Sequence, residues 1–222
     1  MLICGVDDAG RGPVIGPLVI VGVLVDEHGL SNLVKIGVKD SKLLSPRRRK
    51  RLASEIMKIV RDYRIVKVSP REIDEVVRRG KKLHRLNRLE AHVMADIIRE
   101  LKPDLVYVDA SDILPERFGQ HIAEELPFKV EIVSEHKADK KYPVVSAASI
   151  IAKVERDREI EKLREKYGDF GSGYAADPKT IAFLRKWIED HDFFPEFVRK
   201  SWKTVKNLIK EKEGKRQRTL PV

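Results

Sequence analysis

The chain opens on two short hydrophobic runs separated by a turn. The first, residues 2–6, ends at Asp7 and Asp8, and the Ala-Gly-Arg-Gly-Pro segment that follows predicts a turn. The second, residues 18–25, is rich in β-branched side chains. Runs of this length, bounded by turn residues, predict buried β-strands.

Helical spacing begins after Ser45. Ser45 followed by Pro46 is typical of a helix cap and first helical position, and apolar residues then recur on one face, which predicts an amphipathic helix over 46–62. The next expected elements are a strand at 65–68, a short helix after it, a helix at 87–101, a strand at 104–109, a helix near 115–125 and a strand at 128–133.

From residue 143 onward the pattern is mostly helical. It predicts helices over 143–166, 179–190 and 195–212, whereas residues 213–222 are polar and basic without periodicity and are expected to form a mobile tail. Strands that alternate with helices, followed by a helical final third, predict an α/β domain with a helical extension.

Composition narrows the class of protein. A chain of 222 residues with 42% hydrophobic residues is expected to fold as one sizeable domain, and the single Cys4 excludes an intrachain disulfide. The formal net charge of +10 favours polyanionic partners such as nucleic acid, although a merely soluble basic protein has the same balance. There is no apolar run of membrane-spanning length and no basic segment before the first run, so a cytoplasmic protein without a signal peptide is expected.

Acidic residues follow the predicted strands. Asp7 and Asp8 end the first strand, Asp109 ends the strand at 104–109, and Asp139 comes shortly after the strand at 128–133. Sites in open α/β sheets collect at the carboxyl ends of strands, and carboxylates that converge there suit Mg²⁺ or Mn²⁺. Each acid taken alone is equally well explained as a helix cap or a turn residue.

Two glycine-rich segments are further candidates for binding. Gly10-Arg11-Gly12 directly follows the acidic pair, and its glycines allow a phosphate or a ribose to approach the backbone, although tight turns use the same residues. Tyr174 lies in a Gly-Ser-Gly-Tyr loop, and from its residues alone it is better explained as a loop anchor that packs on the core.

Several runs together carry a family resemblance. They are residues 5–13 (Gly-Val-Asp-Asp-Ala-Gly-Arg-Gly-Pro), 40–42 (Asp-Ser-Lys), 108–109 (Val-Asp), 136–139 (His-Lys-Ala-Asp), 142–153 (Tyr-Pro-Val-Val-Ser-Ala-Ala-Ser-Ile-Ile-Ala-Lys) and 171–174 (Gly-Ser-Gly-Tyr). In order and spacing they resemble type 2 ribonuclease H, also called ribonuclease HII, in the single-chain form of the archaeal enzymes.

The resemblance implies a fold and an activity. The fold is ribonuclease H-like, with a five-stranded mixed sheet flanked by helices; the catalytic domain would cover 1–210, with a helical C-terminal subdomain at about 176–210 and a flexible basic tail at 211–222. The activity is cleavage of the RNA strand of RNA/DNA hybrids and incision 5′ to single ribonucleotides in duplex DNA, which leaves 5′-phosphate and 3′-hydroxyl ends.

The resemblance also implies roles for particular residues. Two Mg²⁺ or Mn²⁺ ions would be held by four carboxylates, and the Gly-Arg-Gly turn would contact the ribose 2′-hydroxyl while the tyrosine stacks on the next sugar. Three lysines are candidate phosphate contacts, although each is equally an ordinary surface lysine. The carboxylates are Asp7, Asp8, Asp109 and Asp139, the turn and tyrosine are Gly10, Arg11, Gly12 and Tyr174, and the lysines are Lys42, Lys137 and Lys153.

One position departs from the family pattern. The family usually has Glu where this chain has Asp8, so the charge is kept but the side chain is shorter by one methylene, about 1.5 Å. We expect the activity to survive but to be weaker than with Glu.

The end of the chain suggests a further partner. Residues 217–220 (Gln-Arg-Thr-Leu) resemble the start of a sliding-clamp-binding peptide, but the aromatic pair that should follow is missing. Basic residues in the tail are otherwise explained as diffuse attraction to nucleic acid. A monomer is expected to suffice for the activity.

Other functions compete with this interpretation. A type 3 ribonuclease H or a junction resolvase would share the fold, but the Gly-Arg-Gly turn and the lack of an added N-terminal domain disfavour both. A non-catalytic binder of hybrids would require an acidic cluster that cannot hold metal, and metal-dependent product formation distinguishes it from the nuclease.

Overall fold

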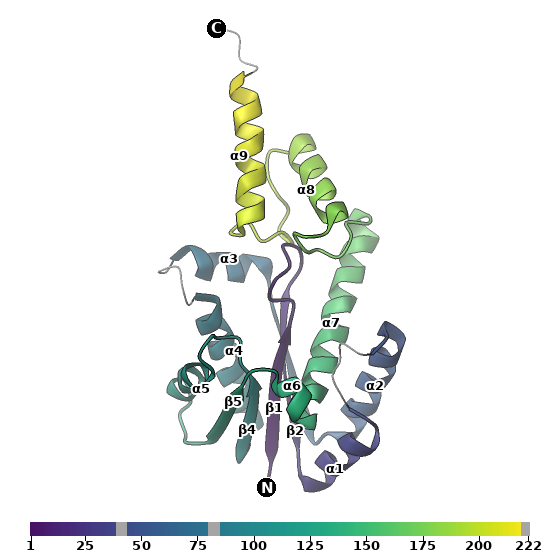
Figure 1. The fold of residues 1–222 in the computed structure, drawn as a ribbon, viewed down its shortest axis with the longest axis vertical. Helices are drawn as coiled ribbons and strands as arrows, with labels where there is room; N and C mark the ends of the chain where they lie inside the picture. The colour runs from purple at the N-terminus through teal and green to yellow at the C-terminus, as the bar shows by residue number, and fades with distance from the viewer. Residues whose placement is uncertain (39–43, 80–84, 219–222) are drawn as a thin grey trace. The chain divides into compact units, whose positions relative to one another are not determined.

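The computed structural model describes residues 1–38, 44–79 and 85–218, with the backbone alone for 215–218. The strands are β1 (Ile3–Ala9), β2 (Leu18–Val25), β3 (Asp62–Val68), β4 (Leu105–Asp109) and β5 (Glu131–Glu135). The helices are α1 (Glu27–Lys35), α2 (Pro46–Ile59), α3 (Pro70–Arg79), α4 (Arg85–Leu101), α5 (Pro115–Glu124), α6 (Ala138–Lys141), α7 (Pro143–Tyr167), α8 (Pro178–Asp190) and α9 (Lys203–Arg218) (Figure 1). No helix in these ranges is both long and apolar enough to cross a bilayer.

The chain divides into two compact units. The first comprises 1–9, 19–67 and 81–156 and contains nearly all of the sheet. The second comprises 10–18, 68–80 and 157–222, so it takes two early segments of the chain in addition to the C-terminal part. The expected helical subdomain at 176–210 falls within this larger second unit.

The sheet of the first unit is mixed, with the order β3-β2-β1-β4-β5. β1 pairs antiparallel with β2, whereas β1 with β4 and β4 with β5 pair in parallel. Because β1 and β4 each pair on both sides, both strands are apolar until the acids near their carboxyl ends. The predicted five-stranded mixed sheet flanked by helices is therefore confirmed.

Helices cover both faces of this sheet (Figure 1). On one face, Val19, Val21 and Val23 of β2 pack in a core with residues of α1, α2 and the first part of α7. On the other face, a Cβ on Gly22 would lie 2.3 Å from Ile97 of α4. The glycine at that position lets α4 approach the sheet closely.

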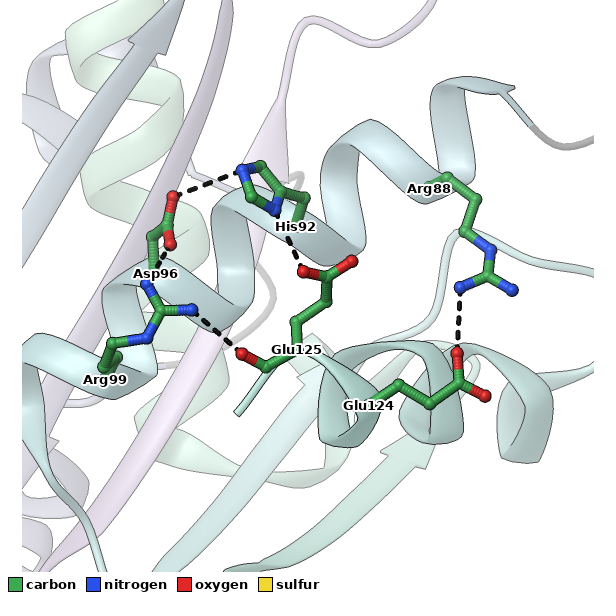
Figure 2. A network of polar contacts seen from close by, with 6 residues as sticks. All are labelled: Arg88, His92, Asp96, Arg99, Glu124 and Glu125. Carbon is green, nitrogen blue, oxygen red and sulfur yellow. Dashed lines mark hydrogen bonds and ion pairs between the residues drawn. The ribbon is translucent and has the colours of Figure 1, made fainter. Parts of the chain in front are cut away.

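Charged side chains join α4 to α5 on the outside of the first unit (Figure 2). Exposed pairs of this kind each contribute only about 0.2–1 kcal/mol, so the network supports the packing of the two helices without determining it. The contacts are Arg88 to Glu124 at 2.9 Å, His92 to Glu125 at 3.3 Å and to Asp96 at 3.6 Å, and Arg99 to Asp96 at 2.5 Å and to the Glu125 carbonyl at 2.9 Å.

The second unit has its own hydrophobic core. Val14 and Ile15, from the segment between β1 and β2, are buried together with Phe170, Phe197 and Leu184 of α8. The backbone of residue 15 pairs with that of Val198 in an isolated antiparallel bridge. Residues 183 positions apart in the chain are thereby fixed side by side.

Most predicted elements are present, and the differences have physical causes. The strand expected at 128–133 is Glu131–Glu135, because its pairing with β4 selects the residues that extend. The helix expected at 195–212 begins only at Lys203, since residues 197–199 bond to residues 14–16 instead. It then continues to Arg218, so the prediction of an aperiodic segment is wrong for 213–218.

Two short helices were not predicted. α1 is capped by Asp26, whose side chain accepts a hydrogen bond from the Gly29 amide at 2.8 Å. α6 has only four residues, too few to show a helical period in the sequence.

Candidate metal centre

Parallel pairing brings two of the predicted acids together. β1 and β4 align Val6 with Val108, and the next residue on each strand is Asp7 and Asp109 respectively. Residues opposite one another on neighbouring strands present their side chains on the same face of the sheet. The register alone therefore places these two carboxylates next to each other at the carboxyl ends of the strands.

The turn after β5 positions the third acid, Asp139. Lys137 adopts a left-handed conformation with φ of 58°, which directs the chain into α6, and the Ala138 amide donates a hydrogen bond to Asp109 at 3.0 Å. Asp139 follows, buried at 4% exposure. Asp7, Asp109 and Asp139 each have a carboxylate oxygen within 4.8 Å of the others.

The electrostatics of this cluster favour a cation. Burial raises the pKa of Asp7 well above its ordinary value, and the charges of Asp8 and Asp109 raise it further. Hard oxygen donors at this spacing fit Mg²⁺ or Mn²⁺, and a divalent ion would offset both the desolvation and the mutual repulsion of the acids.

A hydrogen-bonded pair on α7 lies behind Asp7. The Ser149 side chain, which is fully buried, hydrogen-bonds to the Asp7 carboxyl, and Lys153 donates to the Ser149 hydroxyl at 2.7 Å. Both groups lower the pKa of Asp7 in opposition to burial. Sequence reasoning missed Ser149, although it lies within the run 142–153 that carried the resemblance.

Asp8 is placed differently from the other three predicted acids. Successive residues of a strand face opposite sides of the sheet, so Asp8 does not extend beside Asp7. Its carboxylate instead accepts a hydrogen bond from the Ser111 hydroxyl at 3.3 Å, and it is not part of the three-carboxylate group among the described residues. Asp8 therefore lies outside the three-carboxylate group, although its charge still raises the pKa of Asp7.

The candidate lysines have different surroundings. Lys153 contacts Ser149 rather than standing alone on the surface, whereas Lys137 is an exposed residue at the turn that leads to Asp139. Lys42 lies outside the described residues.

The Gly-Arg-Gly turn and the tyrosine lie together in the second unit. Gly10 has a φ of 93°, a conformation that disfavours any side chain. The ring of Tyr174 lies 3.5 Å from the position that a Cβ on Gly12 would take, and this tyrosine is 43% exposed. The interpretation of Tyr174 as an anchor packed on the core is therefore wrong, because the residue is exposed and its ring lies beside the glycine turn.

We expect Gly10→Ala to lower the stability of the fold by about 1–2 kcal/mol through backbone strain and to impair the nuclease activity that the family resemblance implies. Gly168→Ala is the matched control, because Gly168 also has a positive φ of 85°, belongs to the same unit and has open space around it. Thermal unfolding and kcat/KM, measured on both variants, separate the loss of stability from the loss of activity. Equal losses of activity in the two would refute a specific role for the turn.

Comparison with known proteins identifies the family. The family model described as ribonuclease HII matches residues 4–205, which is most of the chain. This chain belongs to the ribonuclease HII family. It is accordingly an endoribonuclease of the ribonuclease H type, and enzymes of this family depend on divalent metal ions.

Individual ribonuclease HII proteins are similar over their whole length. The enzyme of Pyrococcus abyssi is 49% identical over 222 residues, which cover 99% of this chain and 96% of the relative. The crystal structure of ribonuclease H2 from Pyrococcus horikoshii has a TM-score of 0.88 at 46% identity, covering 95% of this chain and 98% of that one. A ribonuclease HII from Archaeoglobus fulgidus, solved in a complex with PCNA, has a TM-score of 0.83 at 50% identity, with 93% and 96% covered.

Proposed function

We propose that this enzyme cuts the RNA strand of RNA/DNA hybrids and also incises 5′ to single ribonucleotides embedded in duplex DNA, leaving 5′-phosphate and 3′-hydroxyl ends. The observation that carries the proposal is the convergence of Asp7, Asp109 and Asp139 within 4.8 Å at the carboxyl ends of two parallel strands. This donor set fits the divalent ions on which the family depends.

The proposed chemistry is hydrolysis of a phosphodiester. Two bound divalent ions, once present, supply an activated water on one side of the phosphorus and stabilisation of the leaving 3′-oxygen on the other. Asp7, Asp109 and Asp139 would hold them, with Asp8 as a weaker contributor. Ser149 and Lys153 would fix the orientation of the Asp7 carboxylate through the hydrogen bonds already described.

Recognition of the ribonucleotide is proposed for the glycine turn. Asp8 and Gly10 are separated by a single residue, so their Cα atoms lie at most about 7 Å apart whatever the conformation of the chain. The turn follows the acid-bearing end of β1 directly in the chain. The 2′-hydroxyl is the feature that distinguishes a ribonucleotide in a DNA strand, and backbone groups can bind it without reading the base.

Tyr174 and the lysines complete the proposed contacts. The exposed ring of Tyr174 beside Gly12 offers a surface on which the following deoxyribose can stack. Lys137 and Lys42 would contact phosphates, where point charges add affinity without sequence preference. Sequence-independent cutting at ribonucleotides is the expected result.

The substrate range is tested with three matched duplexes. One contains a single ribonucleotide, one is an RNA/DNA hybrid and one is all DNA, each end-labelled and incubated with Mg²⁺, with Mn²⁺ or with chelator. We expect incision of the first two with either metal, no incision with chelator and an intact all-DNA duplex. Cleavage of the hybrid alone would contradict the proposal for single ribonucleotides.

A sliding clamp is the second proposed partner. The A. fulgidus relative was solved with PCNA, and residues 217–222 of this chain begin like a clamp-binding peptide. We expect removal of residues 217–222 to leave incision of free oligonucleotides unchanged and to abolish binding to a clamp in a pull-down or by surface plasmon resonance. Undiminished clamp binding by the shortened chain would show that the contact lies elsewhere.

A further inference from the structure

A fully buried arginine supports the glycine turn. Arg199 has 0% exposure, and its guanidinium donates hydrogen bonds only to backbone carbonyls among the contacts described for its side chain. The acceptors are the carbonyls of Gly10 at 2.5 Å, Arg11 at 2.8 Å and Gly16 at 3.1 Å.

A neighbouring tryptophan takes the next carbonyl of the turn. The Trp202 indole Nε1 donates to the Gly12 carbonyl at 3.2 Å, and the Arg199 guanidinium lies 5.0 Å from the centre of the Trp202 ring. Three successive carbonyls, those of residues 10, 11 and 12, are therefore bonded by side chains from one short segment almost 190 residues later in the chain. All of these residues belong to the second unit.

The backbone around the turn explains why this support is needed. Beyond the ladder between β1 and β2, buried carbonyls require other partners, because an unpaired one is costly. Backbone bonds from the Gly16 amide to Phe197 and from the Arg199 amide to Val14 align the two segments. The Arg199 side chain then reaches the carbonyls that no strand can pair.

The bonded carbonyls also determine where the amides point. In a planar trans peptide the C=O and the N–H point in opposite directions. The Gly10 carbonyl shares its peptide with the Arg11 amide, and the Arg11 carbonyl shares its peptide with the Gly12 amide. Both N–H groups are therefore held facing away from the guanidinium, which is the arrangement needed to donate to a ligand on the opposite side.

We propose that Arg199 is a positioning residue that orients the amides of the Gly10-Arg11-Gly12 turn and thereby sets the preference of the enzyme for a ribonucleotide over a deoxyribonucleotide. The inference rests on the proposed role of that turn. Arginine is suited to this position because its rigid fork reaches several acceptors at once, whereas a lysine ammonium is a single flexible point charge.

The test is the ratio of affinities for two duplexes that differ in one 2′-hydroxyl. Fluorescence anisotropy in chelator gives the Kd of each protein for a duplex with a single ribonucleotide and for the same sequence in DNA. We expect Arg199→Lys to reduce this ratio by roughly tenfold, the equivalent of about 1.4 kcal/mol in oriented hydrogen bonding, while affinity for plain DNA is kept. A partly unfolded sample would lower both affinities together and leave the ratio unchanged.

Asp74→Asn is the matched control. Asp74 is 5% exposed in the same unit and accepts hydrogen bonds from the amides of Lys200 and Ser201, next to Arg199, but it does not bond to the turn. It should lose stability and keep the wild-type ratio. If Arg199→Lys does not fold, Arg199→Gln, which removes the guanidinium fork and its charge, is expected to lower the ratio by at least the same factor.

The results distinguish a failure of the proposed function from a failure of the role proposed for Arg199. A wild-type protein that binds both duplexes equally and does not incise at the ribonucleotide contradicts the proposed function itself. A wild-type protein that discriminates, with a folded Arg199→Lys or Arg199→Gln protein that discriminates equally well, overturns the role of Arg199 and leaves the proposed function standing.

Discussion

Asp7→Asn is expected to reduce incision by at least about a thousandfold, because it removes a proposed metal ligand and its charge from the acidic cluster. The same substitution is expected to stabilise the metal-free protein. Burial and the charges of Asp8 and Asp109 raise the pKa of Asp7, so its ionised form is unfavourable in the folded state. Single-turnover incision and thermal unfolding in chelator measure the two effects.

The sign of the stability effect depends on pH and metal. Since the folded pKa of Asp7 is raised, the stability that its protonated form contributes is present below the unfolded pKa and is lost as pH rises through the folded value. Asp7→Asn has no carboxyl group to ionise at this position, so its stability advantage over the wild type in chelator should grow from acidic to neutral pH. Each kcal/mol of that advantage raises Tm by about 2–4 °C. Saturating Mg²⁺ should remove or reverse it.

Asp26→Asn provides the control for this prediction. Asp26 is also an acid after a strand, but it caps α1, and asparagine is an equally good helix cap. Its activity and stability should match those of the wild type. An Asp7→Asn protein that retains full incision would contradict the assignment of the centre.

Asp8→Glu is expected to increase kcat/KM by roughly tenfold, since ligand placement at the scale of 1 Å has effects of this size or larger. In the structure Asp8 bonds to Ser111 and stands outside the three-carboxylate group. One added methylene extends the reach of the carboxylate by about 1.5 Å. The concentration of Mg²⁺ or Mn²⁺ that gives half-maximal activity should fall at the same time.

Asp8→Asn tests the charge of this side chain separately from its length. It keeps the length of the side chain and removes the negative charge, so it should be slower than the wild type in both metals. If Asp8→Glu incises no faster than the wild type in either metal, the shorter side chain does not limit this enzyme.

Much of the metal centre could be predicted from the sequence because two of its acids directly follow apolar runs that form strands. Apolar runs that end at Asp7 and at Asp109 predict strands with acids at their carboxyl ends, and the parallel register then brings these acids together. Asp139 was harder to place, since it depends on the left-handed Lys137 and on a helix of four residues. For that acid the resemblance to a family was the stronger evidence.

The supporting residues could not be predicted, because they act through long-range contacts. Residues 195–202 have a helical pattern of apolar positions, yet they pair with residues 14–16, and no local signal shows that competition. Arg199 is one of 45 basic residues in the sequence, and only the fold shows that it is buried against the glycine turn. Ser149 is likewise an ordinary serine until α7 places it against Asp7.

The most direct test of the account is incision of an end-labelled duplex that contains one ribonucleotide, measured with wild type and Asp7→Asn in Mg²⁺ and in chelator. The account predicts a single product cut 5′ to the ribonucleotide, formed by the wild type only with metal and lost in Asp7→Asn. Incision that persists in chelator, or that is as fast in Asp7→Asn, would contradict a metal-dependent nuclease centred on Asp7, Asp109 and Asp139.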